Sequence, residues 1–375
     1  MTAAAKDRAS LAVAAAALVA LPFLMRALGL GVTSATEVVV FAIACMGLNV
    51  LVGYTGLVSF GHGAWFGLGA YAAAILQREL LAGQFWLPLI LAVLLVAAIA
   101  AAFGALILRR RGVYFSLLTL ALTAMLYTVA YRWTEVTGGE DGLGGILRPS
   151  FFGIDFEDAA TFYVLVALIG FVTVYALWRF HRSPVGTTLV AIRENEQRAR
   201  FVGYATNRYK LAAFVVSAAL TGLAGVLLLF NNRLTSGEVI SVQFSGELLA
   251  MVVIGGMRSF LGPALGAFFF VIFRDNLSRL TEDWLFWFGL LFVAFIVFSP
   301  TGLVGVAERL LRPWRKVAIE EAAMAARRTG EIALPAFLKP AAHANPTVLE
   351  AGGLAKHFGG IRAVQGIDLA IEDRT

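Results

Sequence analysis

Long apolar runs separated by short charged segments constrain the fold of this chain more than any other feature. Only 14% of its 375 residues are charged, whereas a soluble domain carries roughly 25%. A run of about twenty apolar residues crosses the bilayer as a helix, and in hydrocarbon only helices or closed barrels satisfy their own backbone. Barrel strands would alternate polar and apolar residues, and these runs do not. The sequence therefore predicts an all-α polytopic membrane protein.

The apolar runs predict about eight to ten transmembrane helices. Residues 1–35 are interpreted as an N-terminal signal anchor rather than a cleaved signal peptide, because the apolar stretch is long and further runs follow it. The runs at 243–257 and 260–273 are short and interrupted by glycine, so a re-entrant pair is the alternative to two crossings. The expected crossings are 9–29, 36–54, 58–76, 86–108, 113–131, 160–179, 211–230, 243–257, 260–273 and 284–305.

Basic residues gather in alternate loops. They occur at Arg109–Arg111, throughout residues 180–210 and after residue 305, whereas loop 132–159 is mainly acidic. Cytoplasmic loops of membrane proteins carry the excess of lysine and arginine, so both termini are expected in the cytoplasm. The net charge of +6 therefore indicates orientation in membrane lipid and not a nucleic-acid partner.

The stretch "LNVLVGYTGLVSFGHGAWFGLGAY" (residues 48–71) places many glycines and several polar groups in apolar surroundings. One interpretation is close helix packing, because Gly63 and Gly67 are four residues apart, as are Gly262 and Gly266. The other adds a translocation path, since discontinuous helices occur at membrane depth where they line a cavity. The candidate path and packing residues are Asn49, Ser59, His62, Gly63, Gly67, Gly262 and Gly266.

His62 has no second histidine, cysteine or carboxylate at ligand spacing, so no metal site is expected and a hydrogen-bonded packing role is favoured. An intramembrane enzyme that uses Ser59 and His62 is the alternative from another class, but no residue in the sequence is placed to orient the histidine.

Residues 180–210 predict a short amphipathic helix. Ser183-Pro184 is typical of a helix start, and Gly203 is a plausible stop. Such a helix either lies on lipid headgroups or docks a soluble partner, and the presence of Glu194 among the arginines favours docking. The candidate docking residues are Leu189, Ile192, Arg193, Glu194, Asn195, Arg198 and Gly203.

The C-terminal tail has a different composition. Residues 306–346 are interpreted as a cytoplasmic linker, and 347–375 as a short β-rich segment with strands at Val348–Glu350 and Val364–Glu372. This segment is too short to bury a core alone. The sequence contains no G-x-x-x-x-G-K-[ST] loop and no nucleophile motif, so no catalytic residue is expected.

Five blocks, in one order along residues 36–305, resemble the LivM-type permease subunits of branched-chain amino acid ABC importers. They are "LNVLVGYTGLVSFGHGAWFGLGAY", "RRRGVYFSLLTLAL", "TGGEDGL", "RSPVGTTLVAIRENEQRARFVGY" and "VVIGGMRSFLGPALGA". The tail, "VLEAGGLAKHFGGIRAVQGIDLAIEDRT", resembles the start of a LivG-like ATP-binding domain, in which Phe358 would correspond to the adenine-stacking aromatic. The resemblance thus describes a permease joined to a truncated ATPase fragment.

The resemblance implies an ABC importer permease in the bacterial inner membrane that takes up branched-chain amino acids. It implies a LivH-like second permease subunit, ABC ATPase subunits that bind ATP and Mg, and a periplasmic binding protein that docks on outer loops such as 132–159. The chain itself would bind no cofactor, and Val185–Val202 would be the coupling helix. The alternatives are a urea or short-chain amide permease of the same fold, and a non-transporting scaffold or sensor.

Overall fold

Six helices of the computed structural model are long and apolar enough to cross a membrane. The structure describes residues 3–110, 112–148, 155–299, 301–311, 347–358 and 361–372. It consists of two units, Met1–Pro313 and Trp314–Thr375. The six helices belong to the first unit and are α1 (Ala3–Ala27), α2 (Val32–Thr55), α4 (Trp86–Ile107), α5 (Val113–Arg132), α7 (Ala159–Arg182) and α10 (Thr206–Asn232).

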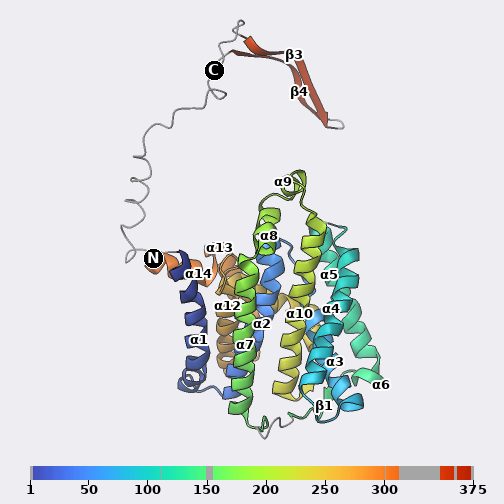
Figure 1. Cartoon of the computed structure of the whole chain (residues 1–375), viewed down its shortest axis with the longest axis vertical. Coiled ribbons are helices and arrows are strands. Elements are labelled where there is room, and N and C mark those ends of the chain that lie inside the picture. The colour runs from blue at the N-terminus through green and yellow to red at the C-terminus, as the bar shows by residue number, and fades with distance from the viewer. Residues whose placement is uncertain are drawn as a thin grey trace. The chain divides into compact units, whose positions relative to one another are not determined.

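Helices α2 and α10 form the centre of the bundle, with α1 and α7 on one side and α4 and α5 on the other (Figure 1). Of the spans, 89% of α2 and 72% of α10 are buried, against 17% of α1 and 28% each of α4 and α5. A helix that is apolar on all sides is suited either to a buried position or to lipid. The low burial of the outer helices therefore marks the lipid-facing surface.

Shorter helices complete the bundle. They are α3 (His62–Ile75), which continues into the π-helical η1 (Leu76–Leu80), α11 (Val242–Gly255), α12 (Gly262–Leu277), α13 (Trp284–Phe298) and α14 (Gly302–Leu311). Helices α11 and α12 have 14 and 16 residues, which is about 21–24 Å at 1.5 Å per residue and less than the bilayer core of about 30 Å. They pack against each other, and the choice between two crossings and a re-entrant pair stays a prediction.

Two expected crossings have different limits in the structure. The run 284–305 is not one helix, because α13 ends at Phe298 and α14 begins at Gly302. Ser299 precedes a proline, and a residue in that position is biased away from helical backbone. The run 58–76 becomes helical only at His62, because residues 56–61 form an irregular connection after α2.

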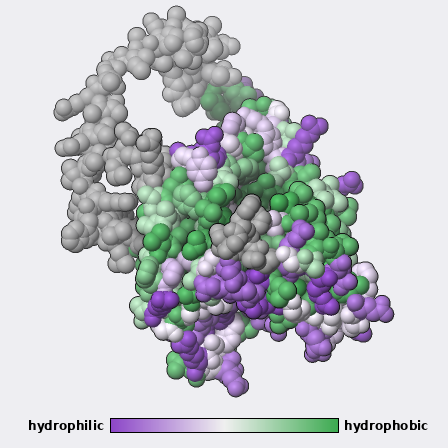
Figure 2. All heavy atoms as spheres, turned by 60° about the horizontal axis from the view of Figure 1, so that its bottom comes forward, coloured by the Kyte–Doolittle hydropathy of each residue, from purple (hydrophilic) through white to green (hydrophobic). Residues whose placement is uncertain are grey.

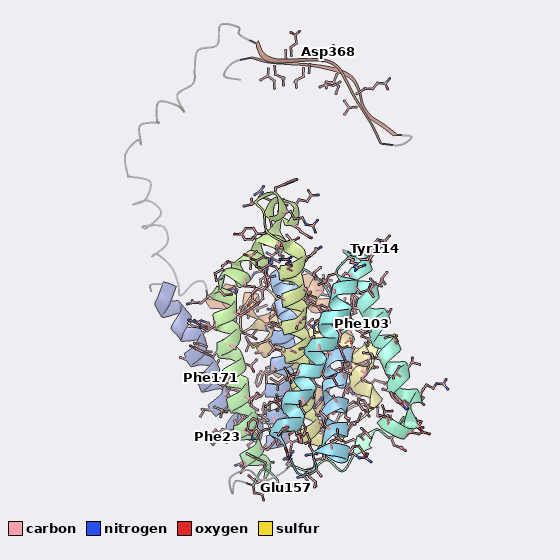
Figure 3. The ribbon with its side chains drawn as sticks, turned by 45° about the vertical axis from the view of Figure 1, so that its right-hand side comes forward. Phe23, Phe103, Tyr114, Glu157, Phe171 and Asp368 are labelled. Carbon is pink, nitrogen blue, oxygen red and sulfur yellow. The ribbon has the colours of Figure 1, made fainter. Side chains whose placement is uncertain are left out.

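The remaining elements lie at the two ends of the bundle. Helices α8 (Pro184–Glu194) and α9 (Glu196–Phe201) lie at one end, where Tyr114 also lies, and Glu157 lies at the opposite end (Figure 3). Figure 2 shows hydrophilic residues gathered on that opposite end and hydrophobic ones around the sides. The basic segments around Arg109 and in 180–210 thus share one end, away from the acidic loop. The short elements of the opposite half are α6 (Thr134–Thr137), β1 (Leu143–Gly144), β2 (Leu234–Thr235) and the 3-10 helix η2 (Gly237–Ile240).

The second unit contains one antiparallel hairpin, β3 (Thr347–Phe358) paired with β4 (Ile361–Glu372). Both strands are found where the sequence predicts them, and β3 is longer than expected. The side chain of Phe358 lies outside the described residues, as does most of the expected linker 306–346; its first residues, 306–311, belong to α14.

Candidate functional site

The connection between α2 and α3 is a non-helical segment inside the bundle, residues 56–61, here called the break. Helix α2 ends because Gly56 adopts a left-handed backbone with φ of 73°, and its N–H donates to the carbonyl of Val52. Glycine reaches this conformation without the steric cost that other residues incur. The glycine-rich sequence therefore produces an unwound segment between two helices.

Hydroxyl side chains of α5 satisfy the backbone of the break. Ser116 donates to the carbonyl of Val58 at 2.7 Å, and the N–H of Phe60 donates to Thr119 at 3.2 Å. Thr123 donates to the carbonyl of Phe60 at 3.4 Å. Non-helical backbone is tolerated at membrane depth only when protein or water satisfies its polar groups. One face of α5 supplies those partners.

His62 joins the break to a second helix. Its Nδ1 lies 3.0 Å from Ser59 Oγ, and its Nε2 lies 2.8 Å from Ser217 Oγ of α10. The next residue, Gly63, donates its N–H to Ser245 of α11 at 2.9 Å. Both ring nitrogens face hydroxyls, so the imidazole forms a buried serine–histidine–serine bridge. In the described part of the chain, no group of three histidine, cysteine or acidic residues could hold a metal ion.

Asn49 lies in α2, one turn before Gly53, and only 2% of its surface is exposed. Its Oδ1 has no hydrogen-bond partner among the described residues. The side chain lies so close to Gly53 that a Cβ atom there would overlap Oδ1. Asn49 thus lies inside α2, about two turns before the break, and no hydrogen bond joins it to Ser59 or His62 among the described residues.

The glycines singled out in the sequence lie against neighbouring backbone or rigid side chains. A Cβ atom added to Gly67 would overlap Ile240, and one added to Gly266 would overlap the carbonyl of Met251. Gly63 meets Ser245, and Gly262 meets the carbonyl of Gly256 in the same way. These contacts place α3 against η2 and α12 against α11 with almost no space between them.

Sequence reasoning missed the contact between α3 and α10. A Cβ atom on Gly225 would overlap the carbonyl of Phe66, and one on Gly69 would overlap the backbone of Gly222. Gly222 and Gly225 are three residues apart in α10, so they lie on neighbouring positions of one helix face. That spacing is the signal that could have identified this contact.

The expected single helix at 185–202 is wrong, because two helices meet at Asn195; we call residues 183–203 the elbow. Ser183 caps α8 by accepting from Gly186 N–H at 3.2 Å, and Pro184 is its first residue. Asn195 has extended backbone, with φ of −158°, and its side chain accepts from Arg198 N–H at 2.8 Å to cap α9. Asparagine is a strong helix cap, so it ends one helix and starts the next.

The apolar residues of the elbow divide into two groups. Leu189 and Ile192 are buried within the bundle. Leu189 belongs to the same apolar cluster as Met46 and Val50 of α2. Phe201 is 90% exposed and Val202 is 71% exposed. The apolar surface available to a partner is thus formed by residues that the sequence analysis did not select. Of the selected residues, Glu194, Asn195, Arg198 and Gly203 are exposed.

A carboxylate fixes the elbow to the bundle. Glu196 Oε1 accepts from Lys210 Nζ at 2.9 Å and from Arg200 at 2.9 Å. It also accepts from the hydroxyl of Thr206 at 3.2 Å. Lys210 is 2% exposed, and a charge that is buried in this way requires a partner. This network therefore links α9 to α10.

Arg193 reaches from α8 to the end of α2. Its Nη1 donates to the carbonyl of Gly53, and its Nη2 lies 2.7 Å from Glu194. The last carbonyls of a helix have no partner within the helix and carry partial negative charge, so a guanidinium is well suited to cap them. Arg193 thus contacts the helix that leads directly into the break.

At the opposite end of the bundle, Arg148 caps the last carbonyls of α10. Its Nε donates to the carbonyl of Phe230 at 2.6 Å, and its Nη2 donates to Asn231. Its guanidinium also lies 4.3 Å from the ring centre of Phe162. Burial lowers the pKa of Arg148 from its ordinary value, with a further contribution from the charge of Arg233. The acidic loop is therefore anchored to α10.

Comparison with known proteins places these features in a family. Residues 31–300 match the family described as branched-chain amino acid transport system, permease component. The high-affinity branched-chain amino acid permease protein LivM of Escherichia coli K12 is 32% identical over 301 residues, which cover 74% of this chain and 71% of that protein. LivM of Salmonella typhimurium LT2 is 33% identical over the same shares. The autoinducer 2 import system permease protein LsrC of Klebsiella pneumoniae is 29% identical over 184 residues, 46% of this chain and 51% of that protein. No solved structure matches the chain.

Proposed function

We propose that this chain, which belongs to the branched-chain amino acid transport system permease family, is a membrane-spanning subunit of an ATP-driven importer of branched-chain amino acids. The elbow is the observation that carries the proposal. It combines a strongly exposed apolar pair, Phe201 and Val202, with charges of both signs on a rigid anchor. Such a surface is suited to a soluble protein partner that pushes on the bundle, whereas a helix resting on lipid headgroups would not need this anchor.

The partner at the elbow is an ABC ATPase subunit, which supplies ATP and Mg; this chain has no catalytic role of its own. ATP-driven movement of the ATPase reaches α10 through Glu196 and Lys210, and α2 through Arg193 and Gly53. The bundle end that carries the elbow therefore faces the cytoplasm of a bacterial cell, and both chain termini lie on that side of the inner membrane. The basic residues at this end support the orientation.

The path for the solute runs beside the break, between this chain and a LivH-like second permease subunit. Asn49, Ser59 and His62 supply polar groups there, and the glycines at 63, 67, 262 and 266 hold the surrounding helices close. A periplasmic binding protein docks on the opposite end, which includes the loop anchored by Arg148. The hairpin β3–β4 is the opening part of an ATP-binding domain, with Phe358 as its adenine-stacking residue.

The test is uptake into vesicles that contain the full chain with the second permease, the ATPases and the binding protein. We expect ATP to drive the uptake of labelled leucine. Urea is tested in parallel, because a urea or short-chain amide permease of the same fold is the alternative. Autoinducer 2 is tested as well, because LsrC is a relative named for autoinducer 2 import. If urea or autoinducer 2 is taken up and leucine is not, that solute is the substrate in place of branched-chain amino acids. If ATP drives the uptake of none of these solutes, the proposal is wrong.

The elbow is tested separately with a Phe201→Ser, Val202→Ser double variant. We expect normal membrane insertion but at least a tenfold loss of leucine uptake and of ATPase binding. Each tenfold change in affinity corresponds to about 1.4 kcal/mol. Two apolar side chains that become buried against the ATPase contribute more than that to the binding free energy. Gln197→Ser, an exposed polar position on α9, is the matched control. Full ATPase binding by the double variant would show that the elbow is not the docking surface.

A further inference from the structure

A cavity opens between α2, α10, η2, α11 and α12, in the half of the bundle away from the elbow. Its volume is about 480 Å³, within the range of about 300–1,000 Å³ typical of small-molecule sites. Phe41, Phe244 and Trp284 form apolar parts of its wall, and Ser241 and Gln243 bring the first turn of α11 to it. The cavity is thus lined both by aromatic rings and by polar groups.

The charges that line this cavity do not balance. Arg274 is paired with Glu37, which also lines the cavity, and with Asp275 at 2.8 Å. Glu238 and Glu247 line it too, and neither forms an ion pair with a basic residue in the described part of the chain. Glu247 accepts a hydrogen bond from Gln243 at 3.1 Å. Glu247 is half-buried and Glu238 is exposed at the mouth of the cavity, so two carboxylates without an ion-pair partner among the described residues face the cavity.

A second, smaller cavity gives an independent observation. Its volume is about 230 Å³, and it shares Leu228, Asn232, Glu238 and Val239 with the first. Thr235 also lines it, is 4% exposed, and has a hydroxyl with no hydrogen-bond partner among the described residues. A buried hydroxyl without a partner is uncommon, because an unpaired buried polar group loses its hydrogen bonds to water and gains none in return. A polar ligand in the joined cavities would satisfy it.

We propose that the joined cavities bind a small solute through its ammonium group, which lies between Glu238 and Glu247, while its apolar side chain lies against Phe41, Phe244 and Trp284. An ammonium forms charge-assisted hydrogen bonds with carboxylates and is attracted to aromatic faces. This inference rests on the proposed function, in which the solute is an α-amino acid. Residues 239–241 at the inner wall pack on Gly63, so the site lies directly before the break.

The test uses the membrane complex of both permease subunits and the ATPases in nanodiscs. The binding protein is left out, so that the affinity of the permease itself for leucine is measured. Leucine, leucinol and 4-methylpentanoate are titrated and thermal stabilisation is recorded. Leucinol keeps the ammonium and lacks the carboxylate, whereas 4-methylpentanoate lacks the ammonium. We expect leucine and leucinol to stabilise the complex and 4-methylpentanoate not to do so. This comparison needs no variant and is therefore independent of any folding defect.

A Glu238→Gln, Glu247→Gln double variant is expected to bind leucine at least tenfold more weakly, because an ammonium forms stronger hydrogen bonds with charged carboxylates than with neutral amides. Glu135→Gln, an exposed carboxylate outside the cavity, serves as the control and keeps wild-type affinity. Unchanged leucine affinity in the double variant, or equal binding of 4-methylpentanoate, overturns the site. If the wild type still shows ATP-driven leucine uptake, only the proposed site is wrong. If the wild type shows no such uptake, the proposed function is wrong as well.

Discussion

Arg193 of α8 donates a hydrogen bond to the carbonyl of Gly53 in the last turn of α2. Its own neighbour Glu194 holds the other side of the guanidinium at 2.7 Å. The contact connects the exposed elbow to the helix that ends at the break. A residue selected from the sequence as part of a docking surface therefore acts inward, on the bundle.

Arg193→Gln is expected to separate ATP hydrolysis from transport. The variant loses the charge that caps α2, so movement of the elbow reaches the break less effectively, and leucine uptake should fall about tenfold if a charged hydrogen bond of about 1.5–3 kcal/mol is lost. Hydrolysis by the ATPases should persist. The same separation is expected when Arg193→Glu is combined with Glu194→Lys. Arg109→Gln, an exposed arginine at the same end of the bundle but outside the elbow, is the control, and equal loss in that variant would contradict a specific role for Arg193.

Gly225→Ala is expected to destabilise the bundle. The added methyl group would overlap the carbonyl of Phe66, and backbone cannot rotate away as a flexible side chain does. Overpacking typically costs about 1–3 kcal/mol, and a contact with backbone lies at the upper end. The measurement is the thermal unfolding temperature in detergent. Gly246→Ala is the control, because an added Cβ at that α11 position meets nothing within 4 Å.

Gly67→Leu is expected to abolish transport, because the position is already filled by Ile240. Gly67→Ala provides a sharper measurement. Its methyl group meets a side chain, so Ile240→Ala in the same chain should restore part of the lost uptake and stability. Full activity of Gly67→Leu would show that α3 and η2 are not in close contact, and the absence of rescue would show that another neighbour limits the position.

Ser59→Ala should destabilise the protein by about 1–3 kcal/mol, the typical cost of a buried polar group that loses its partner. Ser59 Oγ accepts from the N–H of Gly61 at 3.2 Å and lies 3.0 Å from His62. The expected loss is therefore structural, and it should appear in thermal unfolding without the disappearance of any hydrolytic activity. A hydrolytic activity that the wild type has and Ser59→Ala lacks would instead support the intramembrane enzyme.

Asp158 should make stability depend on pH in the acid range. Its carboxylate accepts from the N–H of Thr161 at 2.9 Å and caps α7, and this hydrogen bond lowers the pKa of Asp158 below its ordinary value. A lowered folded-state pKa means that the contribution is present above about pH 4 and is lost as the pH falls through the lowered pKa. Asp158→Asn keeps a capping group but cannot titrate. Its unfolding temperature should therefore fall less steeply below about pH 4 than that of the wild type.

The sequence predicted the helices well where one physical signal dominates. Apolar length alone located α2, α4, α5, α7 and α10 to within a few residues, because the bilayer sets both composition and length. Asn195 shows where such reasoning fails. The apolar spacing around it favours one helix, but its side chain accepts from the N–H of Arg198, three residues on, and divides the segment in two.

The candidate sites were harder to predict, because their partners come from distant parts of the chain. Ser59 and His62 were found from their position in an apolar stretch, but Ser217 and Thr119 are separated from them by far more than a helical turn. Glu196 and Lys210 each read as one charge among many on a basic loop. Only the fold brings them to 2.9 Å and shows that the lysine is buried.

The contact between Gly225 and Phe66 has a mechanical consequence. With no side chain between their backbones, α3 and α10 lie in direct backbone contact. We therefore expect them to move as one unit during the proposed transport cycle. We expect an opening for the solute to form instead where the hydroxyls of α5 meet the break, because water can replace those hydrogen bonds one at a time.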